Sequence, residues 1–176
     1  MLKEACVENF TNVPGVIERG AKRIELCDNL AVGGTTPSIG VIKITAEYCS
    51  DKDASIIVIL RPRGGDFVYS AMEKAIMMRD LEEIIVLQAN GIAVGALTAA
   101  NALDKPFLEE IAKLASDNGI ELAFHMAFDE IPEEKQRDAL LWLGEIGFKR
   151  ILTHGGPKEN TIFDNAAHIA ELAKIT

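Results

Sequence analysis

The sequence predicts an α/β protein built as a parallel (β/α)8 barrel of which six βα units are present. Three observations support this fold class. Strand-like and helix-like segments alternate six times along the 176 residues, which implies a parallel sheet with helical crossovers. Some strand-like segments carry polar side chains on one face, whereas a doubly wound sheet buries both faces in apolar contacts. Another segment has only small side chains on one face, which leaves space inside a barrel.

The elements follow one another with short connections. Runs that alternate in polarity or are rich in β-branched residues indicate strands. These runs are 2–7, 22–27, 55–61, 91–97, 121–128 and 150–153. Apolar residues at intervals of three and four, bounded by glycine, proline or a capping residue, indicate helices. These helices cover 12–20, 39–49, 70–89, 105–118, 132–147 and 161–174.

Three of these strands have a face that does not look like a helix-packing surface. Successive side chains of a strand point to opposite faces, so the second face can be read from the alternation. The residues on it are Arg23, Glu25 and Cys27, then Gly91, Ala93 and Gly95, then His125, Ala127 and Asp129. We expect this face to line a barrel, with the small residues leaving room for a ligand.

The chain is long enough for one domain and too short for two, so residues 1–176 are expected to form a single barrel domain. A barrel of this kind needs eight strands. With six, the first and last strands would be bare edges, which favour aggregation. We therefore expect that strands seven and eight are missing from the C-terminal side, or that a second chain, as in a homo-oligomer, covers the gap.

The composition excludes several classes of binding partner. The formal charge of −9 repels nucleic acid and anionic lipid, and no apolar run reaches the length of a membrane span. The three cysteines do not form a disulfide-scaffold pattern, and the first strand begins too early to leave room for a signal peptide. These features favour a reducing, cytoplasmic location. No glycine motif for a nucleotide cofactor is present.

The two cysteines in the first two strands have matching surroundings. Cys6 follows Glu4 by two residues, and Cys27 follows Glu25 by two residues, so each pair shares a strand face. If the strands are neighbours with the cysteines at matching heights, both thiols can reach one metal ion. Thiolates select Cu(I), with zinc as the competitor. The alternative is that both cysteines are inert and buried, as free cysteine often is.

Charged side chains also gather where strands end. Glu4, Glu25, Arg61, His125 and Asp129 are expected to face one mouth of the barrel, where active sites of this architecture lie. In an enzyme acting on a small anionic metabolite, Glu25, Arg61, His125 and Asp129 would be the catalytic set. The alternative is an ion-pair network that plugs the barrel.

The loop after the third strand is a candidate anion site. Arg61 and Arg63 would clamp an anion, and the backbone of Gly64 and Gly65 would cradle it. The simpler interpretation is that the two glycines allow a tight turn.

In its motifs the sequence resembles the CutC family of TIM-barrel proteins. The motifs occur in the family's order and cover nearly the whole chain. They are Glu4-Ala-Cys6, Gly20-Ala-Lys-Arg23-Ile-Glu25-Leu-Cys27, Gly33-Gly-Thr-Thr-Pro-Ser38, Arg61-Pro-Arg-Gly-Gly-Asp-Phe-Val-Tyr69, Gly91-Ile-Ala-Val-Gly95, Phe124-His-Met-Ala-Phe-Asp129 and Leu152-Thr-His-Gly-Gly156.

The resemblance implies Cu(I) binding and a role in copper homeostasis, with Cys6 and Cys27 as the metal ligands. Two positions depart from the family pattern. Met126 stands where the family usually has arginine, and His154 stands where it commonly has serine. The family's last two strands, with a glycine-rich loop, are absent from this sequence. The family has no firmly assigned reaction, so the resemblance leaves open whether the protein is an enzyme.

Overall fold

The structure is a computed structural model that describes residues 2–156 and 160–175. Six parallel strands form one sheet in sequential order. They are β1 (Glu4–Glu8), β2 (Arg23–Cys27), β3 (Ser55–Ile59), β4 (Gly91–Val94), β5 (Glu121–Phe124) and β6 (Phe148–Ile151). The helices are α1 (Val13–Glu18), α2 (Ile39–Asp51), α3 (Ala71–Val86), α4 (Lys105–Asp117), α5 (Glu133–Glu145) and α6 (Ala166–Leu172). The predicted alternation of six βα units is confirmed.

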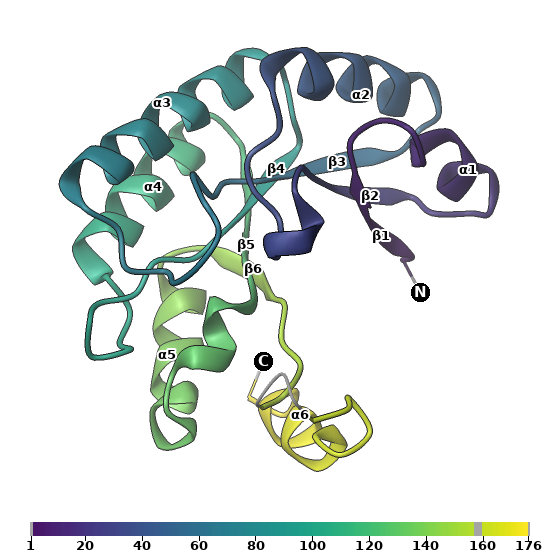
Figure 1. Ribbon diagram of the computed structural model, residues 1–176. Coiled ribbons are helices and arrows are strands. Elements are labelled where there is room, and N and C mark those ends of the chain that lie inside the picture. The colour runs from purple at the N-terminus through teal and green to yellow at the C-terminus, as the bar shows by residue number, and fades with distance from the viewer. Residues whose placement is uncertain (1, 157–159, 176) are drawn as a thin grey trace.

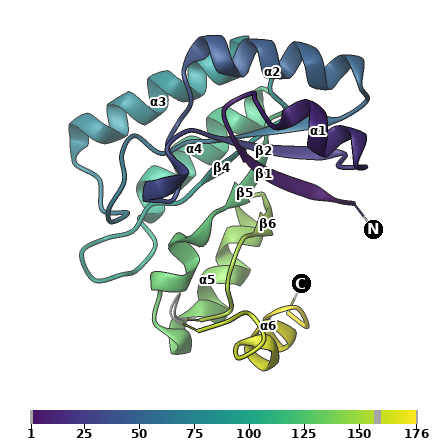
Figure 2. The same cartoon turned by 45° about the vertical axis from the view of Figure 1, so that its right-hand side comes forward.

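The sheet curves, and the helices lie on its convex side (Figure 1). Turning the molecule shows the same layering (Figure 2). Within the described residues β1 and β6 each have one strand neighbour, so they are the two edges of an open barrel. This arrangement agrees with the predicted barrel that lacks two strands.

The strands separate two groups of buried apolar side chains. The larger group fills the space between the sheet and the helices, and includes Ile24, Leu26 and Val58. The smaller group, on the concave face, consists of Ile57, Ala93 and Ala123 with Leu152 packed against it. Each fully buried aliphatic side chain contributes about 1.5–3 kcal/mol by its removal from water. The helix-facing side of the sheet therefore supplies most of the packing energy.

The small residues of β4 do not leave open space, so that prediction is wrong. A Cβ on Gly91 would lie 2.5 Å from the carbonyl oxygen of Glu121 and 2.8 Å from Cδ1 of Ile57. A Cβ on Gly95 would lie 2.6 Å from Cε1 of His125. Glycine is needed here because neighbouring strands and side chains approach closely.

The beginnings of four strands are joined by ion pairs. Nη1 of Arg23 lies 3.4 Å from a carboxylate oxygen of Glu4, and Nη2 lies 3.7 Å from Glu121. Arg150 pairs with Glu121 and reaches Glu4 at 3.9 Å. Glu4 thus lies at the N-terminal end of the strands, and its expected place at the mouth with Arg61 is wrong. The network connects Glu4 of β1 with Arg150 of β6, and so joins the two edge strands across the concave face.

The fifth strand ends earlier than predicted. β5 stops at Phe124, and a 3₁₀ helix, η2 (Met126–Glu130), follows directly. Strand alternation therefore does not apply beyond His125, which caps η2 by accepting a hydrogen bond from the Ala127 amide. Met126, which the alternation of an uninterrupted strand would turn toward the helices, is exposed. A run of apolar residues does not by itself distinguish a long strand from a strand followed by a helical turn.

Candidate functional site

Cys6, Glu25 and Cys27 form a cluster on the concave face of β1 and β2. One ligand atom from each lies within 4.8 Å of the others, and the two sulfurs are 3.8 Å apart. The strands are neighbours and the cysteines share a face, as predicted. The predicted matching heights are wrong, because Cys6 pairs in register with Glu25, whereas Cys27 pairs with Glu8. The side chains of Cys6 and Cys27 point toward each other, so their sulfurs meet although the two residues are offset by two positions along the strands.

The geometry of the two thiols suits a shared metal ion. Two thiolates bound at about 2.3 Å with a near-tetrahedral angle stand about 3.8 Å apart. A disulfide is less well suited, because a lateral spacing of about 4.8 Å combined with the two-residue offset separates the Cα atoms by about 8 Å. All three cysteines of the chain are free.

Without a cation, the surroundings of Cys27 and Glu25 favour the protonated forms of these two side chains. Hydrogen bonding with Cys6 and burial raise the pKa of the Cys27 thiol, and the nearby carboxylate of Glu25 adds to this effect. Burial also raises the pKa of Glu25, against the opposing effect of its hydrogen bond with Cys6. A metal ion would reverse these preferences, because a cation stabilises thiolate and carboxylate. Cys6 is exposed, which provides access to the buried partners.

Cys49 does not belong to this cluster. It lies in α2 and is fully buried in the helix-facing core. Burial raises the pKa of its thiol to about 11, so it behaves as a small apolar side chain. It therefore offers a matched comparison for substitutions at the other two cysteines.

Arg61 follows β3 and is buried. Its Nη1 donates to the carbonyl oxygens of Val32 and Gly34, each at 3.0 Å, and its Nη2 donates to Gly65 at 2.6 Å. The backbone of Arg61 also exchanges hydrogen bonds with Thr36. Arg61 therefore joins the loops that follow β2 and β3.

The side chain of Arg63 forms hydrogen bonds and ion pairs with its own loop and with the start of α3. Its Nε pairs with Glu73, which also completes a capping box at the start of α3. Its Nη2 donates to Asp66 at 3.0 Å and to the carbonyl of Val68 at 2.9 Å, and Nη1 donates to the carbonyls of Gly64 and Asp66. The hydrogen bond with Glu73 raises the pKa of Arg63. The pKa of Glu73 is lowered to about 2, chiefly because its carboxylate accepts a hydrogen bond from the Ser70 amide. An anion role for Arg63, Gly64 and Gly65 stays a prediction.

His125 and Asp129 lie at the mouth but have separate partners. Nδ1 of His125 accepts from the Ala127 amide at 3.2 Å, and burial, aided by the Arg61 charge, lowers the pKa of His125 to about 3. Asp129 accepts from the Thr153 hydroxyl and from the His154 amide, the latter at 3.0 Å. Asp129 thus anchors the segment that follows β6. The catalytic roles of both residues stay predictions.

Two features were missed from the sequence. Glu25 was considered as an acid or base, whereas one of its carboxylate oxygens lies within 4.8 Å of both sulfurs. Register pairing with Cys6 places it there, and this pairing cannot be read from spacing along one strand. Phe67 and Tyr69 were given no role, although Phe67 contacts both Arg61 and His125. Their presence in the Arg61–Tyr69 motif was the available signal.

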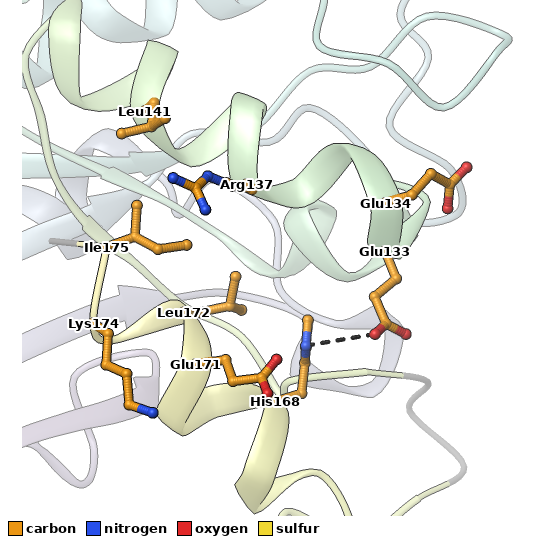
Figure 3. Close-up of a pocket in the computed structure, with 9 residues that line it drawn as sticks. All are labelled: Glu133, Glu134, Arg137, Leu141, His168, Glu171, Leu172, Lys174 and Ile175. Atoms are coloured by element: carbon orange, nitrogen blue, oxygen red, sulfur yellow. Dashed lines mark ion pairs between the residues drawn. The ribbon is translucent and has the colours of Figure 1, made fainter.

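A groove of about 940 Å³ lies elsewhere, between α5 and α6 (Figure 3). Charged side chains of both signs line it, including Glu133, Arg137 and Lys174. His168 faces Glu133 across the groove at 3.7 Å. None of the predicted site residues lines this groove.

Comparison with known proteins identifies relatives along almost the entire chain. The model of the CutC family matches residues 1–176. A CutC family protein of Enterococcus faecalis is 49% identical over 172 residues, which are 98% of this chain and 81% of the relative. A human protein named copper homeostasis protein cutC homolog is 36% identical over 154 residues, covering 88% of this chain and 54% of that protein.

Solved structures agree with this relationship. The crystal structure of a CutC protein from Streptococcus agalactiae superposes with a TM-score of 0.94 at 42% identity, over 99% of this chain and 82% of that one. A deoxyribose phosphate aldolase from Aeropyrum pernix superposes with a TM-score of 0.68 at 10% identity, over 98% of this chain and 70% of the aldolase. The second likeness concerns the barrel fold alone. Among the described residues, no helix is both long and apolar enough to span a membrane.

Proposed function

The chain belongs to the CutC family, and from this premise we propose that it binds Cu(I) through Cys6 and Cys27 as part of copper homeostasis. The observation that carries the proposal is the 3.8 Å separation of the two sulfur atoms on neighbouring strands. Two soft thiolates that converge on one point favour Cu(I) over harder divalent ions.

Glu25 completes the proposed donor set. Its carboxylate lies within 4.8 Å of both sulfurs and is buried beside Cys27. A sulfur separation of 3.8 Å implies a bent sulfur–metal–sulfur angle, which leaves room for a third donor. Because the pKa of the Cys27 thiol is raised without metal, Cu(I) would displace a proton from this thiol as it binds. In this proposal Cu(I) is the cargo of the protein. It would enter from the side of Cys6, whose side chain is exposed.

A reducing compartment fits the proposal. Free thiols and Cu(I) both persist under reducing conditions, and all three cysteines are free. We therefore place the protein in the cytoplasm. The enzymatic alternative, with Glu25, Arg61, His125 and Asp129 as the catalytic set, stays a prediction, as does the homo-oligomer.

The test is a competition titration of Cu(I) against a coloured Cu(I) chelator, without oxygen. We expect one Cu(I) per chain, and an affinity at least about tenfold lower in the Cys6→Ser, Cys27→Ser double variant, because both soft ligands are removed. Cys49→Ser is the matched control and should keep the wild-type affinity. Glu25→Gln should weaken binding less than the double variant.

Equal Cu(I) affinity in the wild type and the double variant would exclude this ligand pair. Circular dichroism of each variant without metal separates loss of ligands from loss of fold. A parallel titration with Zn²⁺ measures the selectivity, which we expect to favour Cu(I) because the two sulfur donors are soft.

A further inference from the structure

Three buried side-chain donors near the C-terminal ends of the strands have no hydrogen-bond partner. They are Nε of Arg61, the hydroxyl of Tyr69 and Nε2 of His125. Each of the three residues is at least nine-tenths buried, with 4%, 6% and 4% of its surface exposed, respectively. Buried polar atoms in native proteins nearly always have partners, and an orphaned donor costs about 1–3 kcal/mol. Three orphaned donors in one region suggest that a ligand is to be bound there.

All three atoms present a hydrogen. The Ala127 amide donates to Nδ1 of His125, and the imidazole is neutral at pH 7 because its pKa is lowered to about 3. The single ring proton is therefore on Nε2. Burial raises the pKa of Tyr69 to about 12, so its hydroxyl is protonated. The Nε of Arg61 always carries hydrogen. The matching ligand group must accept hydrogen bonds.

The charge at this site is also unbalanced. Within the described chain Arg61 forms no ion pair, and its two Nη atoms donate to three backbone carbonyls. Arg63, two residues further on, is more exposed yet pairs with both Asp66 and Glu73. A buried, unpaired guanidinium is costly, whereas an exposed one needs no partner. A bound anion would supply the missing negative charge.

The aromatic ring of Phe67 joins the members of the cluster. Cζ of Arg61 lies 4.8 Å from the centre of the Phe67 ring, and the centres of the Phe67 and His125 rings are 5.0 Å apart. The Arg61 guanidinium is close enough to Tyr69 to oppose the rise in the pKa of that hydroxyl. Phe67 itself is only half-buried and lies in the loop between β3 and α3.

We propose that Arg61, Tyr69 and His125 form a binding site for the oxyanion group of a small molecule, a carboxylate or a phosphate, beneath Phe67 as a movable cover. The three donor atoms have almost no surface in contact with solvent, and Phe67 lies against Arg61 and His125, so this ring would move aside when the ligand enters. This site goes beyond copper binding and shares none of the three proposed metal ligands. It adjoins them at Gly34, whose carbonyl binds Arg61 and where a Cβ would lie 3.3 Å from the sulfur of Cys27.

The test titrates the full chain with inorganic phosphate in one arm and acetate in the other, by calorimetry and by thermal unfolding. Potassium chloride at equal ionic strength is the baseline. We expect saturable binding and a rise in the unfolding temperature in at least one arm, because a ligand that binds only the folded state stabilises it. Binding in one arm alone identifies the ligand group, and binding in both indicates a general oxyanion site.

Tyr69→Phe removes one donor and leaves the ring. The variant should fold at least as stably as the wild type without anion, because it deletes an unpartnered buried hydroxyl, and should bind the anion at least about tenfold more weakly, since a hydrogen bond to a charged group is lost. Tyr48→Phe, in α2, is the matched control and should bind like the wild type. Phe67→Ala should bind the anion with a faster association rate.

Two results would overturn the proposal. One is the absence of any effect of phosphate or acetate beyond that of potassium chloride. The other is binding that Tyr69→Phe leaves unchanged, which would place the anion on the protein surface. Neither result bears on Cu(I) binding, which depends on different side chains and is measured separately.

Discussion

Replacing Gly91 with alanine is expected to destabilise the protein by about 3 kcal/mol, because the barrel has no room for one methyl group at this position. The new Cβ would lie 2.5 Å from the carbonyl oxygen of Glu121 and 2.8 Å from Cδ1 of Ile57. Gly91 pairs with both of these residues, one on each neighbouring strand. The carbonyl cannot retreat without disturbing the ladder between β4 and β5. Urea unfolding measures the loss, which corresponds to a fall in Tm of about 6–12 °C.

Gly144→Ala is the matched control. Gly144 is an exposed residue of α5, and a Cβ there would meet no atom within 4 Å. Alanine is a better helix former than glycine, so this substitution should stabilise the protein by about 0.5–1 kcal/mol. The same chemical change should therefore have opposite signs at the two positions. Wild-type stability in Gly91→Ala would mean that β4 and β5 do not approach each other as described.

Lowering the pH from 7 to 5 is expected to cost about 2 kcal/mol of stability through His125 alone. Burial and the Arg61 charge lower the pKa of His125 in the folded state to about 3, whereas the unfolded value is about 6.5. At pH values between these two pKa values, His125 binds a proton in the unfolded chain but not in the folded protein. The stability is therefore fully present above about pH 6.5 and is lost progressively as the pH falls.

Other groups act differently in this range. The pKa of Glu25 is raised, so Glu25 favours the folded state as the pH falls and opposes His125. The pKa values of Asp66 and Glu73 are lowered, and their contributions are lost only below about pH 4.5. A comparison between pH 7 and pH 5 therefore separates His125 from these two carboxylates, though not from Glu25.

The variant His125→Asn isolates the contribution of the histidine. Asparagine keeps an acceptor for the Ala127 amide and does not titrate, and Glu25 is present in both proteins. We expect the pH dependence of urea unfolding to be shallower in the variant by about 2 kcal/mol over this interval. Identical slopes for the two proteins would show that His125 is accessible to protons in the folded state.

The cluster of Cys6, Glu25 and Cys27 shows how much the alternation of strand residues can predict. Period two was enough to place Cys6, Glu25 and Cys27 on one face, and the structure confirms this. It could not show that Cys6 lies opposite Glu25 and that Cys27 lies opposite Glu8. Register depends on how two strands pack together in the barrel. Glu25 was consequently missed as a third donor.

Other errors have the same origin. Glu4 shares the face of Cys6, as predicted, but its partners Arg23 and Arg150 hold it at the opposite end of the strands. Gly91 of β4 and Gly95, which follows this strand, were interpreted as leaving open space, although neighbouring strands and His125 fill it. Both depend on residues distant in sequence, which alternation along a single strand does not include.

The amino-acid pattern by itself determined the six βα units and the division of strands such as β2 into a helix-facing side and a concave side, because these depend on periodicities of two and about 3.6 residues within single segments. Only the tertiary structure decided which side chains meet across strands. The approach of two sulfurs, the lack of an ion-pair partner for Arg61 among the described residues and the burial of His125 all arise from strand register and loop packing. These are properties of the assembled sheet, in which distant segments determine the distance, charge and water content around each group.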